Sequence, residues 1–265
     1  MTRRPVLFPC EGNWLVGTVD EAPGTSGLLI VTGGNEVRSG AWAGQAQFAA
    51  RIAAAGFPVM RFDRRGVGDS EGGNGGYRTS GPDIAAALAA FREEVPQLSR
   101  VIGWGNCDGA SALMLAGGAG CDGLALSNPW TLREEAEGDA PALPPPEMLR
   151  DHYKRRLRDP AALKRLLTGK VGLKSLLSSL RSAATPAVPK VELTGLAREL
   201  DEGLAGFAGD IRFLIAERDR TGQAFKAAWH AQDPRIRLCP DATHSFVEAE
   251  ARAWLEAQLL DALRT

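Results

Sequence analysis

The chain of 265 residues lacks several features that would place it in common protein classes. Its four cysteines form no CxxC pair and have no histidine pair at zinc-ligand spacing, which argues against a metal site and a disulfide framework. No stretch approaches the about 20 apolar residues of a membrane span, and the N-terminus lacks the apolar core of a secretory signal. A formal net charge of −1 gives no global attraction to nucleic acid. We therefore expect a cytoplasmic protein with free thiols, no transmembrane segment, no metal, no cofactor and no nucleic-acid partner.

The sequence does contain a regular alternation of apolar strands and amphipathic helices. The first two predicted strands form an antiparallel pair, and the later ones are continuous apolar runs, typical of parallel strands buried on both faces. We expect strands at residues 4–12, 13–22, 27–34, 57–63, 100–105, 123–129, 210–219 and 235–242, and helices at 42–56, 81–95, 108–118 and 247–263. This order predicts an α/β fold with a mostly parallel, doubly wound sheet.

The alternation stops after the sixth strand for about 80 residues. Residues 133–148 are acidic and rich in proline, and residues 152–182 are basic and rich in leucine. We interpret residues 131–207 as a helical cap inserted into a core made of residues 1–130 and 208–265. The leucines predict an apolar face over an acyl pocket, and the basic residues predict a face for the phosphates of coenzyme A, an acyl carrier protein or an anionic membrane surface.

Within and beside this cap we expect substrate contacts from Arg155, Arg156 and Trp130. A charged face exposed to solvent over ordinary core leucines explains the same pattern, and the sequence leaves both interpretations open.

The stretch 101–114, VIGWGNCDGASALM, leads from a strand through a tight turn into a helix. Gly105, Asn106, Cys107, Asp108 and Gly109 match the GxSxG frame of a nucleophile elbow, with cysteine in the place of serine. The following helix directs its first amides and its positive dipole end toward the Cys107 sulfur, which favours the thiolate. We expect Cys107 to be the nucleophile. A cysteine in such a turn is also compatible with a small buried hydrophobic residue.

A cysteine nucleophile needs a base, and the chain has three histidines. His152 lies in the basic cap segment and His230 on an expected amphipathic helix, where surface positions are typical. His244 directly follows the last strand, at the edge where the nucleophile lies. We therefore expect His244 to be the base.

The acid that orients the base is expected on a loop at the same edge of the sheet. Glu217 and Asp219 both follow the seventh strand, and we prefer Asp219 because it lies nearer the strand end. Asp241, on the loop that carries the histidine, is a further candidate. The resulting order of nucleophile, acid and histidine is Cys107, Asp219, His244.

Two further segments complete the expected site. The stretch VTGGNE, residues 31–36, follows the third strand and is placed to supply an oxyanion-hole amide from Gly34 or Asn35, together with the amide of Asp108. These glycines are also compatible with a simple turn. The stretch RFDRRGVGDSEG, residues 61–72, is interpreted as architectural.

With these motifs in register, the chain resembles α/β-hydrolases over nearly its whole length. The stretches VTGGNEVRSG, FDRRGVGDSEG and WGNCDGASA resemble the hydrolase 1 family associated with the exosortase A system. That resemblance implies a cytoplasmic hydrolase encoded near genes for exopolysaccharide synthesis and acyl activation.

The cysteine narrows the expected reaction. A thiolate attacks thioesters and activated esters effectively but expels a poor alkoxide with difficulty. We expect an ester or thioester hydrolase that works through an acyl-enzyme, as a thioesterase or an acyltransferase. A non-catalytic lipid-binding protein and a lyase or isomerase on the same fold are the alternatives.

Overall fold

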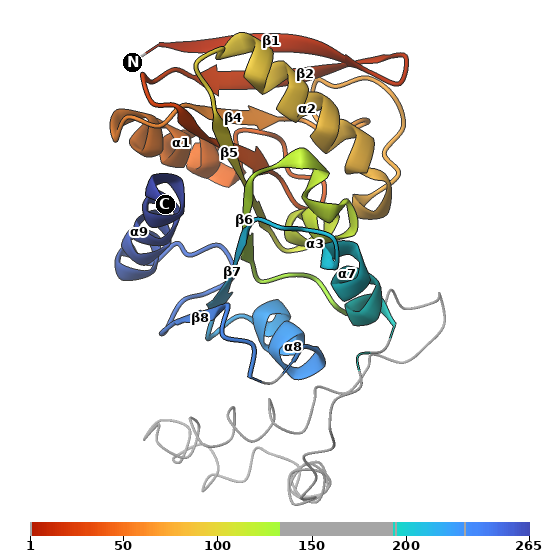
Figure 1. Ribbon diagram of the computed structural model, residues 1–265, viewed down its shortest axis with the longest axis vertical. Helices are drawn as coiled ribbons and strands as arrows, with labels where there is room; N and C mark the ends of the chain where they lie inside the picture. The colour runs from red at the N-terminus through yellow and green to blue at the C-terminus, as the bar shows by residue number, and fades with distance from the viewer. Residues whose placement is uncertain (1, 133–192, 194, 231) are drawn as a thin grey trace, which may run out of the picture. The chain divides into compact units, whose positions relative to one another are not determined.

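The computed structural model describes residues 2–132, 193, 195–230 and 232–265. An eight-stranded sheet runs through this part of the chain (Figure 1). Its strands are β1 (Arg3–Cys10), β2 (Asn13–Asp20), β3 (Ser26–Val31), β4 (Val59–Phe62), β5 (Arg100–Asn106), β6 (Gly123–Ser127), β7 (Asp210–Ala216) and β8 (Ile236–Cys239).

The strand order is β1-β2-β4-β3-β5-β6-β7-β8. The strands β1 and β2 pair antiparallel, and β2 pairs antiparallel with β4. All remaining neighbours, from β4 through β8, are parallel. Since parallel strands end at the same edge, the residues that follow β3, β5, β6, β7 and β8 are brought together at one edge of the sheet.

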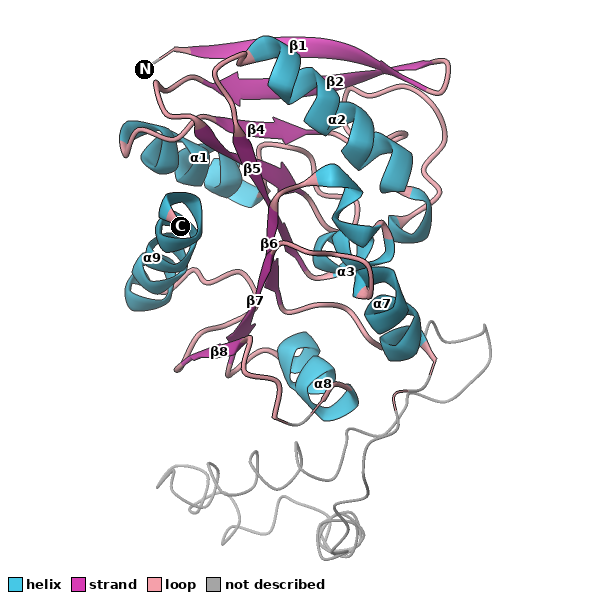
Figure 2. Cartoon of the chain, viewed as in Figure 1, coloured by secondary structure: helices cyan, strands magenta, loops and turns pink. Residues whose placement is uncertain are grey.

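Helices cover both faces of this sheet (Figure 2). They are α1 (Gly44–Ala54), α2 (Gly81–Glu94), α3 (Asp108–Leu115), α7 (Leu196–Leu204), α8 (Arg220–Ala228) and α9 (Ala249–Arg264). The helices α1 and α9 lie on one face, where Phe48 and Leu259 belong to the same buried cluster. The others lie on the opposite face, where Phe91, Leu113 and Phe225 form part of a second cluster.

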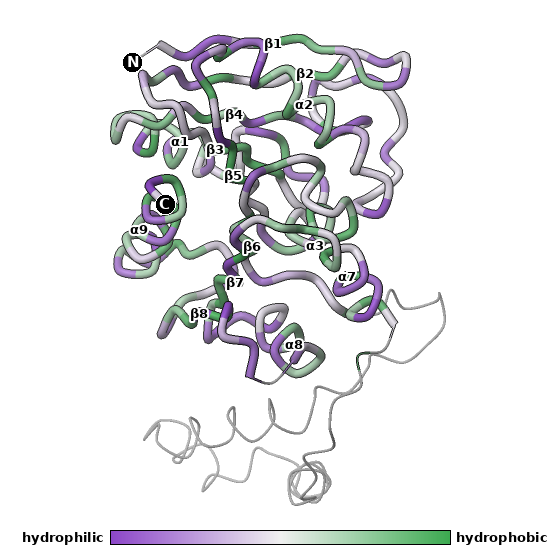
Figure 3. The backbone as a smooth tube through the Cα atoms, viewed as in Figure 1, coloured by the Kyte–Doolittle hydropathy of each residue, from purple (hydrophilic) through white to green (hydrophobic). Residues whose placement is uncertain are grey.

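The expected sheet, its antiparallel first pair and its mostly parallel remainder are confirmed. The predicted cap, residues 131–207, stays a prediction; α7 lies within those bounds, yet it packs against α3 and belongs to the same compact unit as the sheet. Helix α7 mixes hydrophilic and hydrophobic residues (Figure 3), and its apolar face is buried in the core. The expected cap helices, including Arg155, Arg156 and His152, lie outside the described residues.

Two local expectations also needed correction. Helix α3 ends at Leu115 rather than at 118, because a separate short 3-10 turn, Gly117–Gly120, follows it with glycines at positive φ. His230 lies just beyond the end of α8 rather than on it. Its side chain is about half exposed, with Nε2 3.4 Å from Asp201 Oδ1.

Candidate active site

Cys107 is the single residue between the end of β5 and the start of α3. Its backbone has φ 58° and ψ −128°, a conformation that costs free energy for a residue with a side chain. The two flanking glycines make this turn possible. A Cβ atom on Gly105 would lie 2.5 Å from the Gly109 carbonyl carbon, and one on Gly109 would lie 2.5 Å from the Val31 carbonyl oxygen. The predicted elbow geometry is therefore present, with the partly exposed Cys107 at its apex.

His244 lies on the loop after β8, close to this elbow, and pairs with Asp219. The distance between His244 Nδ1 and Asp219 Oδ2 is 3.0 Å. Asp219 is the N-cap of α8, and its Oδ2 also accepts a hydrogen bond of 2.9 Å from the Gly222 amide. The Asp219 side chain is 7% exposed and that of His244 is 40% exposed. The acid is thus fixed inside the protein, while the imidazole faces the site.

This pairing changes the protonation of both groups. The hydrogen bond to Asp219, and after it the interaction with Cys107, raises the pKa of His244 to about 10, although partial burial opposes the shift. Burial works against ionisation of Asp219, yet the bonds from His244 and from the Gly222 amide hold its pKa below the ordinary value. At neutral pH His244 is therefore an imidazolium facing an ionised Asp219.

The structure brings Cys107, His244 and Asp219 together and leaves the two other acid candidates elsewhere. Asp241 is exposed on the histidine loop. Glu217 is half-buried, and its backbone amide donates to the Cys239 carbonyl, where it connects β7 to β8. The sequence-based preference for Asp219 agrees with this geometry.

The expected oxyanion amides are only partly available in this conformation. The Gly34 amide donates a 2.5 Å hydrogen bond to Asp108 Oδ1, so it is not free to bind an oxyanion. The expectation for Gly34 stays a prediction, and in this structure the Asp108 carboxylate occupies its amide. The amides of Asp108, the first residue of α3, and of Asn35 remain predicted donors.

The loop after β3 is fixed in place by residues 61–72, the segment that the sequence analysis interprets as architectural. Arg64 is buried, and its guanidinium donates to the Gly34 carbonyl and, at 2.9 Å, to Ser80 Oγ. Asp63, also buried, accepts the Arg38 amide at 2.6 Å and forms an ion pair with the Arg38 side chain. The arginine and aspartate of this motif thus fix the loop that faces Cys107.

Asn128 was missed by the sequence reasoning, although it directly follows β6 at the functional edge. It is fully buried, with φ 42°. Its Oδ1 accepts the Ala216 amide at 2.8 Å, and its Nδ2 lies 3.1 Å from the His244 carbonyl and 3.2 Å from Asn106 Oδ1. One side chain therefore connects the ends of three neighbouring strands to the histidine loop. In the sequence, Asn128 could have been found as the amide residue that directly follows an apolar strand.

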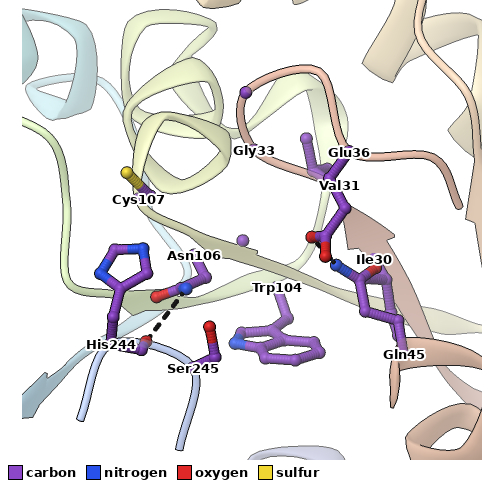
Figure 4. A pocket seen from close by; sticks show the side chains of 12 residues that line it. Ile30, Val31, Gly33, Glu36, Gln45, Trp104, Asn106, Cys107, His244 and Ser245 are labelled. Carbon is purple, nitrogen blue, oxygen red and sulfur yellow. Dashed lines mark hydrogen bonds between the residues drawn. The ribbon is translucent and has the colours of Figure 1, made fainter. Parts of the chain in front are cut away.

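A cavity of about 260 Å³ opens beside these residues. Cys107 and His244 lie on one side of it, and Glu36 and Gln45 lie on the other (Figure 4). Trp130 instead packs against the core on the α2 and α3 side, and its backbone amide donates to the Cys107 carbonyl at 3.3 Å. Its predicted substrate contact stays a prediction.

Among the described residues, no group of histidine, cysteine or carboxylate side chains is placed to bind a metal ion. The helices in this part of the chain include none with the length and apolar character that crossing a bilayer requires.

Comparisons with known proteins agree with this architecture. Residues 24–257 match the model of the alpha/beta hydrolase family. The fold is similar to that of the esterase Pf2001 of Pyrococcus furiosus, with 15% identity and a TM-score of 0.61 over 99% of this chain and 90% of that one. It is also similar to the alpha/beta hydrolase GrgF from Penicillium sp. sh18, with 17% identity and a TM-score of 0.64 over 100% and 98% of the two chains.

A third similar structure is Est1E of Butyrivibrio proteoclasticus bound to ferulic acid, with 13% identity and a TM-score of 0.58 over 98% and 100% of the chains. The comparison with curated protein sequences found no match. At these identities the structural similarity concerns the fold. The family model spans most of the chain, and with the elbow, the histidine loop and the sheet order it shows that the chain belongs to the alpha/beta hydrolase family of enzymes.

Proposed function

We propose that this enzyme cleaves thioesters and activated esters through an acyl group held on Cys107. The observation that carries the proposal is the 3.0 Å pair of His244 and Asp219 beside a cysteine at the apex of the elbow. A retained acid and histidine argue against a non-catalytic lipid-binding protein, which needs neither. The acyl-enzyme intermediate also distinguishes this function from that of a lyase or isomerase, which would form none.

In the proposed mechanism the Cys107 thiolate attacks the substrate carbonyl carbon, and a carbon–sulfur bond forms. The carbonyl electron pair moves to oxygen, where the amide of Asp108 donates a hydrogen bond. When this intermediate collapses, the bond to the leaving thiolate or alkoxide breaks, and the leaving group takes a proton from the His244 imidazolium.

The same histidine then serves the second half of the reaction as a base. Having given up its proton, His244 accepts one from a water molecule, which attacks the acyl-enzyme carbonyl. Collapse of the second intermediate breaks the carbon–sulfur bond, releases a carboxylic acid and restores the thiolate and imidazolium. In an acyltransferase, the hydroxyl or amine of an acceptor would take the place of water.

The substrate's carrier is proposed from residues outside the described part of the chain. The basic cap residues, among them Arg155 and Arg156, suit the phosphates of coenzyme A or the acidic surface of an acyl carrier protein. A cytoplasmic setting and a role linked to exopolysaccharide synthesis follow from the resemblance to the exosortase-associated hydrolases and belong to this proposal.

The test is intact mass spectrometry after brief exposure to a panel of acyl thioesters, free and carrier-bound. We expect a mass increase equal to the acyl group, mapped by peptide digestion to Cys107. The gain should be absent in Cys107→Ala and should persist longer in His244→Ala, in which deacylation lacks its base. Turnover should fall by about three orders of magnitude or more in each variant, with the double variant little worse.

Turnover without any acyl-enzyme, or with Cys107→Ala still active, would contradict the proposal. Turnover that survives the loss of Cys107 but not of His244 would instead indicate the lyase or isomerase alternative.

A further inference from the structure

The loop after β3 and the start of α3 approach each other closely beside Cys107. A Cβ atom on Gly33 would lie 2.5 Å from Asp108 Oδ1 and 2.8 Å from the Asn106 carbonyl oxygen. Figure 4 shows Gly33 on this loop, beside the helix that begins after Cys107. At this point the Gly34 amide donates a 2.5 Å hydrogen bond to Asp108 Oδ1. A single carboxylate therefore joins the loop to the residue that follows the nucleophile.

This hydrogen bond competes with the chemistry of the site. In the hydrolases of this fold, two backbone amides bind the substrate oxyanion, one from the residue after the nucleophile and one from the loop after the third strand. The Gly34 amide has one hydrogen to donate, and the Asp108 carboxylate accepts it. The carboxylate also places negative charge where the substrate oxygen becomes negative. Both effects disfavour the transition state, and loss of one such donor lowers kcat by about 100-fold or more.

The loop keeps its position through contacts that do not involve Asp108. The buried Arg64 donates to the Gly34 carbonyl, and the buried Asp63 accepts the Arg38 amide at 2.6 Å. The Asp108 side chain is only half-buried, and among the described residues it has no ion pair and no second hydrogen-bond donor. Its carboxylate can therefore leave the Gly34 amide while the loop stays in place.

We propose that this bond is an autoinhibitory contact, in which the Asp108 carboxylate occupies the Gly34 amide in the resting enzyme and must leave it before Cys107 is acylated efficiently. The inference rests on the proposed acyl-enzyme function and adds control of its first step. Binding energy from the remote parts of a large substrate can be used to displace the carboxylate, whereas a small thioester supplies little. The contact thereby limits acylation by small reactive esters.

The test measures kcat/KM for the N-acetylcysteamine thioester of butanoate. Asp108→Ala frees the Gly34 amide and removes the charge, so we expect a rise of about tenfold or more. Asp108→Asn keeps the shape and an acceptor oxygen, and its rise should be smaller, because a charged acceptor binds an amide more strongly than a neutral one. Glu250→Ala removes an exposed carboxylate from the first turn of α9 and is the matched control, which should keep the wild-type value.

Two further measurements separate a freed amide from a more reactive sulfur. Removal of a negative charge beside Cys107 also favours its thiolate, and alkylation by iodoacetamide reports this effect alone, because that displacement forms no oxyanion. The rise in kcat/KM for Asp108→Ala should exceed the rise in alkylation rate about tenfold or more. Trifluoromethyl propyl ketone adds the Cys107 sulfur to its carbonyl carbon and moves the electron pair to oxygen, so its inhibition constant should fall by a similar factor.

An unchanged or lower kcat/KM in Asp108→Ala would overturn the inference, and a loss in Asp108→Ala that Asp108→Asn restores would instead assign the carboxylate a positioning role. Equal rises in kcat/KM and in alkylation would also overturn it. If no thioester acylates the wild type or Asp108→Ala, the proposed function fails, and the ketone decides the autoinhibitory contact. A tighter adduct with Asp108→Ala than with the wild type supports it, whereas equal binding or no adduct overturns it.

Discussion

The chemistry of the four cysteines differs because their surroundings differ. Cys107 is partly exposed at the start of α3 and beside an imidazolium, whereas Cys10, Cys121 and Cys239 are buried. Burial raises the pKa of Cys10 and of Cys239 to about 11 and that of Cys121 to about 12. A thiol with a pKa of about 11 is ionised in about one molecule in ten thousand at pH 7, so it reacts slowly with electrophiles.

We therefore predict that a limiting amount of iodoacetamide at neutral pH labels Cys107 first. Peptide mapping over time should show this label at least about 100-fold faster than any other, and turnover should fall in step with it. Cys107→Ala provides the control, because its remaining thiols should react only on denaturation. Preferential labelling of another cysteine in the folded wild type would remove the central argument for the nucleophile.

The residues of the site were predictable from sequence to the extent that strand ends mark them. Cys107, Asp219 and His244 each follow a recognisable apolar strand, and parallel strands bring such positions together. The bond between Asp108 and the Gly34 amide was not predictable in this way. It depends on how closely the loop after β3 approaches α3, where a Cβ on Gly33 would lie 2.5 Å from Asp108 Oδ1.

At the scale of elements, the site depends on how the strand ends are connected. The side chain of Asn128 links the last residue of β7, the last residue of β5 and the loop that carries His244. None of these contacts touches a reacting atom, so Asn128 is a positioning residue. Its removal leaves the buried Ala216 amide without its acceptor and takes away one of the two side-chain hydrogen bonds to the His244 carbonyl, the other coming from Asn106 Nδ2 at 3.2 Å.

We predict that Asn128→Ala lowers kcat by up to about 100-fold with a smaller change in KM, because His244 is displaced rather than the cavity altered. Stability should also fall, by about 1–3 kcal/mol, as expected when a buried polar group loses its partner. Steady-state kinetics on an acyl thioester and urea unfolding measure the two effects. Asn13→Ala, at the first residue of β2 and far from the site, is the control and should retain wild-type kcat. A variant that loses stability but keeps kcat would assign Asn128 a structural role only.

The elements themselves were predicted well where periodicity and neighbours agree. In the sequence, the buried strands are apolar runs and α9 has the pattern of an amphipathic helix. The predicted cap, residues 131–207, includes α7 because the next apolar strand begins only at residue 210, yet the buried leucines of α7 pack on α3. A local pattern shows that a helix has an apolar face, but it does not show which neighbour covers that face.

On the scale of the whole molecule, the pair of His244 and Asp219 links the stability of the fold to pH. The folded pKa of His244, about 10, lies above the ordinary value of 6.5, so its contribution is complete below about pH 6.5 and is lost as the pH rises through about 10. The pKa of Asp219 is lowered, so its contribution is present above the ordinary value of 3.8 and is lost as the pH falls below it. The pair therefore stabilises the fold most between these two limits.

We predict that the free energy of unfolding of the wild type declines between pH 6.5 and pH 10.5 more steeply than that of His244→Gln. Asp219→Asn should flatten the same slope, because it removes the hydrogen bond that is the main cause of the raised histidine pKa. Urea unfolding at a series of pH values provides the measurement, and the difference between the curves reports the coupled titration of His244, Asp219 and the neighbouring Cys107. Parallel curves for the wild type and both variants would mean that the imidazole carries no extra proton in the folded enzyme. In that case the leaving group in the proposed mechanism would need another proton donor, because the first step draws its proton from the His244 imidazolium.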